Sequence, residues 1–201
     1  MTYKNTSITP HTNLLFPQQV MKFLVEHTIL ILSFLLSIIS IVSFIYFYKN
    51  GLGLAYNDAR SHLDIGRRVV ENLQPGLAQL GSVWLPLPHL LMIPTIWNNF
   101  MWHSGLSGSL QSMISFVGTG ILIYLFLKKL KVSMLGRLVG IFVWIANLNV
   151  LYLQSTAMTE LLLLGSMTAG IYYLLLWQNE EKILDIMYAA FWIMLATLNR
   201  Y

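Results

Sequence analysis

The sequence predicts an all-α protein: a polytopic bundle of about five transmembrane helices, with amphipathic surface helices in its first outer loop. Of its 201 residues, 56% are hydrophobic and only 10% are charged, whereas an average soluble domain carries about 25% charged residues. Several uncharged apolar runs approach or exceed the length of about 20 residues that a helix needs to cross a bilayer. This composition excludes an ordinary soluble domain.

Five apolar segments form the predicted spans, and they divide the chain into an N-terminal segment, residues 1–27, and a membrane module, residues 28–201. The first span follows a largely polar lead of 27 residues and lacks a small-residue cleavage site, so it is not expected to be a cleaved signal peptide. The fifth span is the weakest, because Asp185 lies near its start. The predicted spans cover residues 28–48, 104–127, 138–153, 161–177 and 183–198.

The loop KKLKVSMLGR, residues 128–137, sets the predicted orientation. It holds four basic residues and no acid, and basic residues in short loops stay on the cytoplasmic side. Residues 1–27 are then cytoplasmic and loop 49–103 is extracytoplasmic, as in a multi-pass protein of the cell membrane. The cytoplasmic placement of the basic residues accounts for the net charge of +4. No nucleic-acid partner is therefore expected. The absence of cysteine excludes disulfides and thiolate metal sites.

The most charged stretch, YNDARSHLDIGRRVVEN, covers residues 56–72 and predicts an amphipathic surface helix over 57–77. Asn57 is the expected N-cap, and Pro75-Gly76 the expected stop. At 100° per residue, one face is apolar and a second carries charges whose i,i+4 spacing forms pairs of opposite sign. The apolar face holds Ala59, Leu63, Gly66, Val70, Leu73 and Leu77, and the charged face holds Arg60, Asp64, Arg67, Arg68 and Glu71.

Asp58 and His62 lie one turn apart on a third face of this helix. In one interpretation Asp58 stabilises the positive end of the helix dipole and His62 is an interfacial side chain. In the other, Asp58 faces a cavity as a general base or a metal ligand, and His62 positions it or a ligand. Spacing alone leaves both open.

The segment QLGSVWLPLPHLLMIPTIWNNFMWHSG, residues 79–105, is apolar but is broken by three prolines. Backbone groups freed by proline cannot face lipid unsatisfied, so the segment predicts a second surface or re-entrant element rather than a span. Its tryptophans are expected near the lipid headgroups. His89 and His103 are interpreted as interfacial polar groups; a metal site built from the two is a weaker alternative.

Glu160 opens the fourth predicted span on the outer side. An acid at a helix start is common, so this position alone does not indicate a site. However, the predicted topology places Asp58 and Glu160 on the same side of the membrane. Acids at membrane depth tend to mark functional sites, so the two are expected to share a pocket.

Four segments together resemble the GT-C class of polytopic glycosyltransferases: Tyr56–His62, Trp84–His89, Leu151–Glu160 and Asn199–Tyr201. The chain is similar to lipid-phosphate-sugar-dependent mannosyltransferases and aminoarabinose transferases over roughly residues 28–201. Members of this class usually have more spans and a downstream portion. The resemblance therefore implies that the chain is the N-terminal part of a longer protein.

The resemblance implies an inverting transfer of a sugar from a polyprenyl-phosphate donor to the hydroxyl of an acceptor glycan, lipid or protein. Asp58 would be the catalytic carboxylate, and Glu160 would orient the acceptor or bind a cation; some members of the class need a divalent ion such as Mg²⁺ or Mn²⁺, and others do not. His62 and Arg200 would stabilise the leaving phosphate. His89 and Tyr201, which lie in the same segments, are further candidate substrate contacts. Unlike members with an acidic pair, this chain has no acid next to Asp58.

Two other functions remain open from the sequence. A non-enzymatic transporter or assembly subunit is compatible with the many helix-packing features and the lack of a strong catalytic motif. Transporters usually have related halves and ionisable groups near mid-membrane, and the span interiors show neither. A scaffold that has lost the reaction is the third interpretation.

Overall fold

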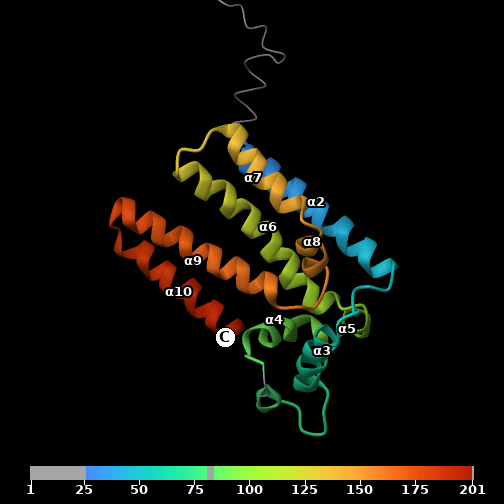
Figure 1. The fold of residues 1–201 in the computed structure, drawn as a ribbon. Coiled ribbons are helices and arrows are strands. Elements are labelled where there is room, and N and C mark those ends of the chain that lie inside the picture. Colours follow the sequence, from blue (N-terminus) through green and yellow to red (C-terminus); the bar gives the residue numbers. More distant parts are fainter. Residues whose placement is uncertain (1–25, 81–83, 201) are drawn as a thin grey trace, which may run out of the picture.

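The computed structural model describes residues 26–80 and 84–200, and every regular element in these ranges is helical (Figure 1). The predicted all-α class is confirmed. Predictions that fall on residues 1–25 and on Tyr201 lie outside the described residues.

Three helices are long and apolar enough to cross a membrane: α2 (Thr28–Lys49), α6 (Leu106–Lys129) and α9 (Glu160–Glu180). They correspond to the first, second and fourth predicted spans within a few residues. In the described part of the chain the number rises to four if a bent helix pair is counted as one span.

The third predicted span, residues 138–153, is not one helix. The structure has α7 (Met134–Ala146) and α8 (Leu148–Gln154), which meet at an angle of 63°. The break falls at Asn147, whose side chain accepts hydrogen bonds from the backbone N–H groups of residues 149 and 150. Asparagine is a favoured N-cap because its oxygen satisfies such free donors, so the new helix starts at this residue.

The fifth predicted span corresponds to α10 (Ile183–Asn199), which has 17 residues. This is shorter than the roughly 20 residues of a typical spanning helix. In Figure 1, α10 lies beside α9 at the edge of the bundle, and α6 lies between α9 and α7. Helix α2 also packs against α6.

The core of the bundle forms around the fully buried Phe116 of α6. Leu36 of α2 is also buried in this cluster. Trp144 of α7 packs with its ring centroid 5.6 Å from that of Phe116. Its indole N–H donates to the Phe116 carbonyl oxygen at 3.2 Å, so the polar end of the tryptophan is satisfied inside the bundle.

A buried polar contact fastens α8 to α2. The Gln154 side chain is fully buried, and its Oε1 accepts a hydrogen bond from the Ser40 hydroxyl at 2.5 Å. Its amide N–H group donates to the hydroxyl of Ser155 at 2.6 Å. Buried polar groups cost free energy unless they are paired, so this network fixes the position of α8 and of the turn that follows it.

Three short helices cover one end of the bundle: α3 (Asn57–Val70), α4 (Leu87–Ile96) and α5 (Asn99–His103) (Figure 1). A 3-10 turn, η1 (Leu77–Gln79), lies between α3 and α4. As expected, no long helix forms over residues 79–105. Pro86 and Pro88 lie at the start of α4, whereas Pro94 is accommodated inside it.

The amphipathic helix predicted over residues 57–77 is shorter than expected. Its N-cap is Tyr56 rather than Asn57, and its C-cap is Glu71, before the expected stop at Pro75-Gly76. The predicted apolar face is buried at Ala59 and Leu63, which are both 0% exposed. On the third face, His62 is buried against His89 of α4, whereas Asp58 is exposed.

The charged face of α3 packs partly against α5. Two of the three expected ion pairs form, Arg60 with Asp64 at 3.2 Å and Arg67 with Glu71. The Trp102 indole N–H donates to the Asp64 carboxylate at 3.1 Å, and the guanidinium groups of Arg60 and Arg67 lie 4.8 Å from the Trp102 ring. The charged side chains of α3 therefore bind α5 through Trp102, in addition to facing solvent.

Two members of the charged face depart from the prediction. Arg68 reaches the backbone oxygen of Asp64, at 3.4 Å, rather than its carboxylate. Arg67 is only 9% exposed and donates to the Ile96 carbonyl at 2.7 Å and to the Asn99 side chain at 2.8 Å. The last carbonyls of a helix have no partners within it. The free Ile96 carbonyl at the end of α4 therefore accepts a hydrogen bond from Arg67, which is buried as a result.

Candidate functional site

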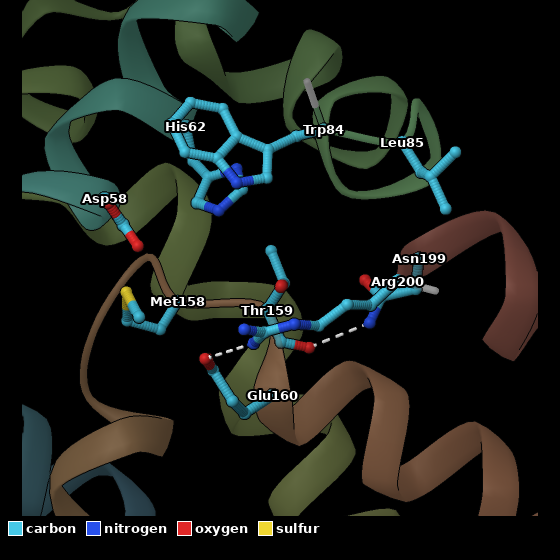
Figure 2. Close-up of a pocket in the computed structure, with 9 residues that line it drawn as sticks. All are labelled: Asp58, His62, Trp84, Leu85, Met158, Thr159, Glu160, Asn199 and Arg200. Carbon is cyan, nitrogen blue, oxygen red and sulfur yellow. Dashed lines mark hydrogen bonds and ion pairs between the residues drawn. The ribbon is translucent and has the colours of Figure 1, made fainter. Parts of the chain in front are cut away.

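A cavity of about 230 Å³ lies where α3, the segment before α4, the start of α9 and the end of α10 meet. It brings together four of the residues that the sequence predicted: Asp58, His62, Glu160 and Arg200 (Figure 2). The nine lining residues are Asp58, His62, Trp84, Leu85, Met158, Thr159, Glu160, Asn199 and Arg200. The expectation that Asp58 and Glu160 share a pocket is therefore met.

Asp58 enters the cavity from the first turn of α3. Its side chain is exposed, and Figure 2 shows its carboxylate pointing into the cavity. The first turn of a helix also stabilises negative charge through the helix dipole. The first interpretation fits this position, and the cavity is the setting that the second interpretation, a general base or a metal ligand, requires.

Glu160 and Arg200 form an ion pair on the opposite side of the cavity. Glu160 is the first residue of α9, and its Oε1 accepts from Nη1 of Arg200, the C-cap of α10, at 2.6 Å. The second carboxylate oxygen, Oε2, is buried and has no hydrogen-bond partner among the described residues. One oxygen thus orients the guanidinium, and the other is enclosed by the protein without a partner among the described residues.

Asn199 adds a neutral amide that the analysis of single side chains missed. It is 4% exposed, and its amide N–H group donates to the Thr159 carbonyl at 2.9 Å. Its Oδ1 has no partner within the described part of the chain. The available signal was its position beside Arg200 in the segment Asn199–Tyr201. The contact fixes the end of α10 against the turn that leads into Glu160.

The turn before α9 is held from below by serine side chains of α6. The Ser109 hydroxyl donates to the Ser155 carbonyl at 3.1 Å, and the Ser112 hydroxyl to the Met158 carbonyl at 2.8 Å. Both serines are buried. Buried loop carbonyls need hydrogen-bond partners, so these two bonds fix the conformation of the turn. The turn in turn fixes the position of Glu160.

His62 and His89 form a contact that the sequence analysis did not predict. His62 Nδ1 lies 2.9 Å from His89 Nε2, and the side chains are 4% and 1% exposed. The interfacial interpretation of His89 is therefore wrong, because α3 packs on α4 and encloses it. His89 does not line the cavity. It contacts His62, which does. By contrast, His103 is exposed, as an interfacial group would be.

Burial is the main cause of a lowered pKa at both imidazoles. At His62, the carboxylates of Asp58 and Glu160 partly oppose this and Arg200 adds to it, with a lowered pKa as the net result. At His89, burial and the neighbouring His62 lower the pKa to about 4, despite a backbone hydrogen bond to Leu85 that raises it. Desolvation disfavours the charged form of a histidine, so the pair favours the neutral state.

A divalent ion between Asp58 and Glu160 is a poor fit to this geometry. No group of three His, Asp or Glu side chains suited to a metal ion occurs in residues 26–80 and 84–200. Glu160 already pairs with the Arg200 guanidinium, and an incoming cation would compete with this positive group. Mg²⁺ can be held by one or two carboxylates with substrate phosphates, but the arrangement seen here favours direct contact between Arg200 and an anion.

The described fold and cavity define an all-helical chain with several helices suited to crossing a membrane. At one end of the bundle it carries a cavity lined by two carboxylates, a guanidinium and an imidazole. Comparison with protein-family models, curated proteins and solved structures finds no match for this chain. The resemblance to the GT-C class therefore rests on the sequence segments.

Proposed function

We propose that the chain is the N-terminal part of a GT-C-like membrane glycosyltransferase that moves a sugar from a polyprenyl-phosphate donor to an acceptor hydroxyl with inversion. The observation that supports this most is the shared cavity. It joins Asp58 and Glu160, which are 102 positions apart in the sequence, next to Arg200 and at the end of apolar helices. A carboxylate that accepts a proton and a guanidinium that binds an anion are the two groups such a transfer needs.

In the proposed arrangement the cavity faces the extracytoplasmic side of the cell membrane. Residues 128–137, with their four basic side chains, connect α6 and α7 at the end of the bundle away from α3 and α4 (Figure 1). Basic loops stay in the cytoplasm, so the cavity end lies outside. Five segments would cross the bilayer, with α7 and α8 together forming one bent span. The lipid-linked donor would enter the cavity laterally from the bilayer.

Asp58 acts as the general base in this proposal. It takes the proton of the acceptor hydroxyl as that oxygen forms a bond to the anomeric carbon of the sugar. The bond from that carbon to the phosphate oxygen breaks, and the phosphate oxygen keeps the electron pair. Attack from the face opposite the leaving group inverts the anomeric centre. General-base assistance of this kind typically contributes a factor of about 10² to 10⁴ in rate.

Arg200 binds the leaving polyprenyl phosphate, because a guanidinium presents planar paired donors that match phosphate oxygens. Glu160 holds Arg200 through Oε1 and lines the cavity in which the acceptor would bind. The resemblance implies further residues downstream of position 201, so the transfer assay uses the full-length protein.

A membrane assay with a radiolabelled polyprenyl-phosphate sugar and the full-length protein tests this function. We expect Asp58→Asn to lower the transfer rate by about 10² to 10⁴. The matched control is Asp64→Asn on the same helix, since Asp64 pairs with Arg60 and Trp102 and does not line the cavity. If Asp58→Asn and Glu160→Gln both retained wild-type transfer, the assignment would be abandoned.

A further inference from the structure

We infer that Asn199 is a positioning residue: it fastens the end of α10 to the residue at which α9 begins, and so keeps the Arg200 guanidinium at the cavity. The inference rests on the proposed function in one respect, namely that the anion bound by Arg200 is the phosphate of the lipid-linked donor. The placement of Arg200 itself can be measured without that reaction.

Two consecutive residues at the end of α10 contact two consecutive residues at the start of α9. Asn199, the last residue of α10, donates from its side-chain amide to the Thr159 carbonyl oxygen at 2.9 Å. Arg200, the next residue, donates from Nη1 to Glu160 Oε1 at 2.6 Å. Figure 2 shows these two contacts next to each other. The two helix ends are therefore joined at two neighbouring positions.

The ion pair alone is a weak determinant of where Arg200 lies. The Arg200 and Glu160 side chains are 53% and 30% exposed, and ion pairs in such positions are weakened by water and by the loss of side-chain freedom. Arg200 is also the C-cap of α10, with an extended backbone (φ −160°, ψ 147°). No further helical turn holds the residue, so its position depends on what fixes the end of α10.

The contact made by Asn199 is buried. The residue is only 4% exposed, and a hydrogen bond between uncharged groups is stronger in such surroundings than in water. Asparagine is a weaker helix former than alanine or leucine. Its amide binds a carbonyl 40 positions away rather than one in its own helix. The residue type at position 199 is thus explained by the contact with the start of α9, not by the stability of α10.

The acceptor of this bond marks the beginning of α9. Thr159 is the N-cap of α9, and its carbonyl oxygen also accepts from the backbone N–H of Leu163 at 3.1 Å. A carbonyl oxygen has two lone pairs and can accept both bonds. Asn199 therefore binds one residue before Glu160. This contact keeps the alignment of the two helix ends that brings Arg200 to Glu160.

Asn199 affects a ligand through Arg200 rather than by direct contact. It lines the cavity, but its Oδ1 is enclosed by the protein and has no hydrogen-bond partner in the described part of the chain. Its amide nitrogen is engaged by Thr159. Arg200, in contrast, is half-exposed and carries a permanent charge. The two neighbours thus have different roles, one placing the end of the helix and the other binding the anion.

Reaction with phenylglyoxal, a reagent for arginine, tests the placement of Arg200 in the full-length protein in lipid nanodiscs. The reagent attacks the uncharged guanidine, so an ion pair that stabilises the charged form slows the reaction. We expect residue 200 to be modified faster in Asn199→Ala and in Asn199→Leu than in the wild type, with rates approaching that of Glu160→Gln. Asn199→Leu keeps the volume of the side chain, so it separates the lost hydrogen bond from an empty space.

Asn179→Ala is the matched control for the modification experiment. Asn179 lies near the other end of α9, and its amide donates to the Leu175 carbonyl of its own helix at 2.6 Å. The rate at residue 200, measured by mass spectrometry, should be that of the wild type. An unchanged rate in both variants of Asn199 would overturn the inference.

A double-mutant cycle in the transfer assay separates positioning from a general structural role. Loss of one hydrogen bond between uncharged groups is typically worth a factor of about two to ten, and we expect this loss of kcat/KM in Asn199→Leu. In the Arg200→Gln background the same substitution should have no further effect, because the two residues act as one unit. An equal loss in both backgrounds would overturn the inference. If the wild type transfers no sugar, the proposed function fails and the phenylglyoxal experiment decides the inference alone.

Discussion

The Arg200 guanidinium lies 2.6 Å from the Glu160 carboxylate and joins the end of α10 to the first residue of α9. The side chains are 53% and 30% exposed. Ion pairs in such positions contribute about 0.2 to 1 kcal/mol to stability, because water screens them and both side chains lose freedom. The pair is thus better suited to orienting Arg200 at the cavity than to stabilising the fold.

We expect Arg200→Gln to separate activity from stability. A hydrogen bond to a charged group is worth about 1.5 to 3 kcal/mol, so sugar transfer should fall by roughly 10- to 150-fold. The free energy of unfolding should change by less than about 1 kcal/mol. Transfer rates and denaturant unfolding in detergent measure the two quantities. Arg200→Lys should lie between, because lysine keeps the charge without the planar fork.

The Lys129–Glu180 pair supplies the matched control for this experiment. It joins α6 to α9 at 2.5 Å, with side chains 28% and 37% exposed, but lies at the opposite end of α9. Lys129→Gln should change stability as little as Arg200→Gln does and leave transfer intact. An equal loss of transfer in both variants would show that the effect of Arg200 is structural.

Acid should destabilise the protein through the buried histidine pair. Burial lowers the pKa of His89 from about 6.5 to about 4, so between these values the unfolded chain binds a proton that the folded one does not. Stability is then fully present above pH 6.5 and falls as pH drops toward 4, by at most about 1.4 kcal/mol per pH unit for this group. Unfolding in denaturant at a series of pH values measures the slope.

Two variants isolate the contribution of His89 from that of the carboxylates. His89→Leu should give a shallower loss of stability between pH 6.5 and 4 than the wild type. His103→Gln, which replaces an exposed histidine, should keep the wild-type slope. A slope unchanged in His89→Leu would mean that other groups cause the acid sensitivity.

Periodicity along one helix identified much of α3 but could not identify its neighbours. The spacing of Ala59 and Leu63 predicted the buried face correctly, because residues four apart share a face in any α-helix. The burial of Arg67 depends on the carbonyl of Ile96 and the side chain of Asn99, which come from the next two helices. No pattern within residues 57–77 contains that information.

The candidate site divides in the same way. Topology alone predicted that Asp58 and Glu160 lie on the same side of the bundle. Asp58 follows one predicted span and Glu160 follows three, and an odd number of spans places both on the side opposite the N-terminus. The His62–His89 contact depends on how α3 packs against α4, and its partners are 27 positions apart. The one available signal was that His89 interrupts an apolar segment, where an unpaired polar group is costly.

The predicted orientation can be measured directly because the chain contains no cysteine. Leu73→Cys places a thiol on a side chain that is 100% exposed, in the loop after α3, and Lys128→Cys places one on the exposed basic end of α6. A membrane-impermeant maleimide added to intact cells should label only the first, and should label both after permeabilisation. Labelling of residue 128 alone in intact cells would invert the topology and place the cavity in the cytoplasm.

A substitution at Gly108 of α6 is expected to shift Glu160, because Gly108 packs against the turn that precedes Glu160. A Cβ at this position would lie 2.9 Å from the backbone Cα of Ala157 and 3.0 Å from Cε of Met92. Ala157 belongs to the turn that Ser109 and Ser112 hold in place, so the turn cannot move away freely. Overpacking of this kind costs about 1 to 3 kcal/mol.

We therefore expect Gly108→Ala to lower both the free energy of unfolding and the rate of sugar transfer, because the displaced turn carries Glu160 away from Asp58. Gly118→Ala on the same helix is the control: nothing lies within 4 Å of its new Cβ, and alanine favours a helix over glycine by about 0.5 to 1 kcal/mol. Gly118→Ala should be neutral or stabilising, with normal transfer. If Gly108→Ala were destabilised but fully active when assayed below its unfolding temperature, the position of this turn would not control the cavity.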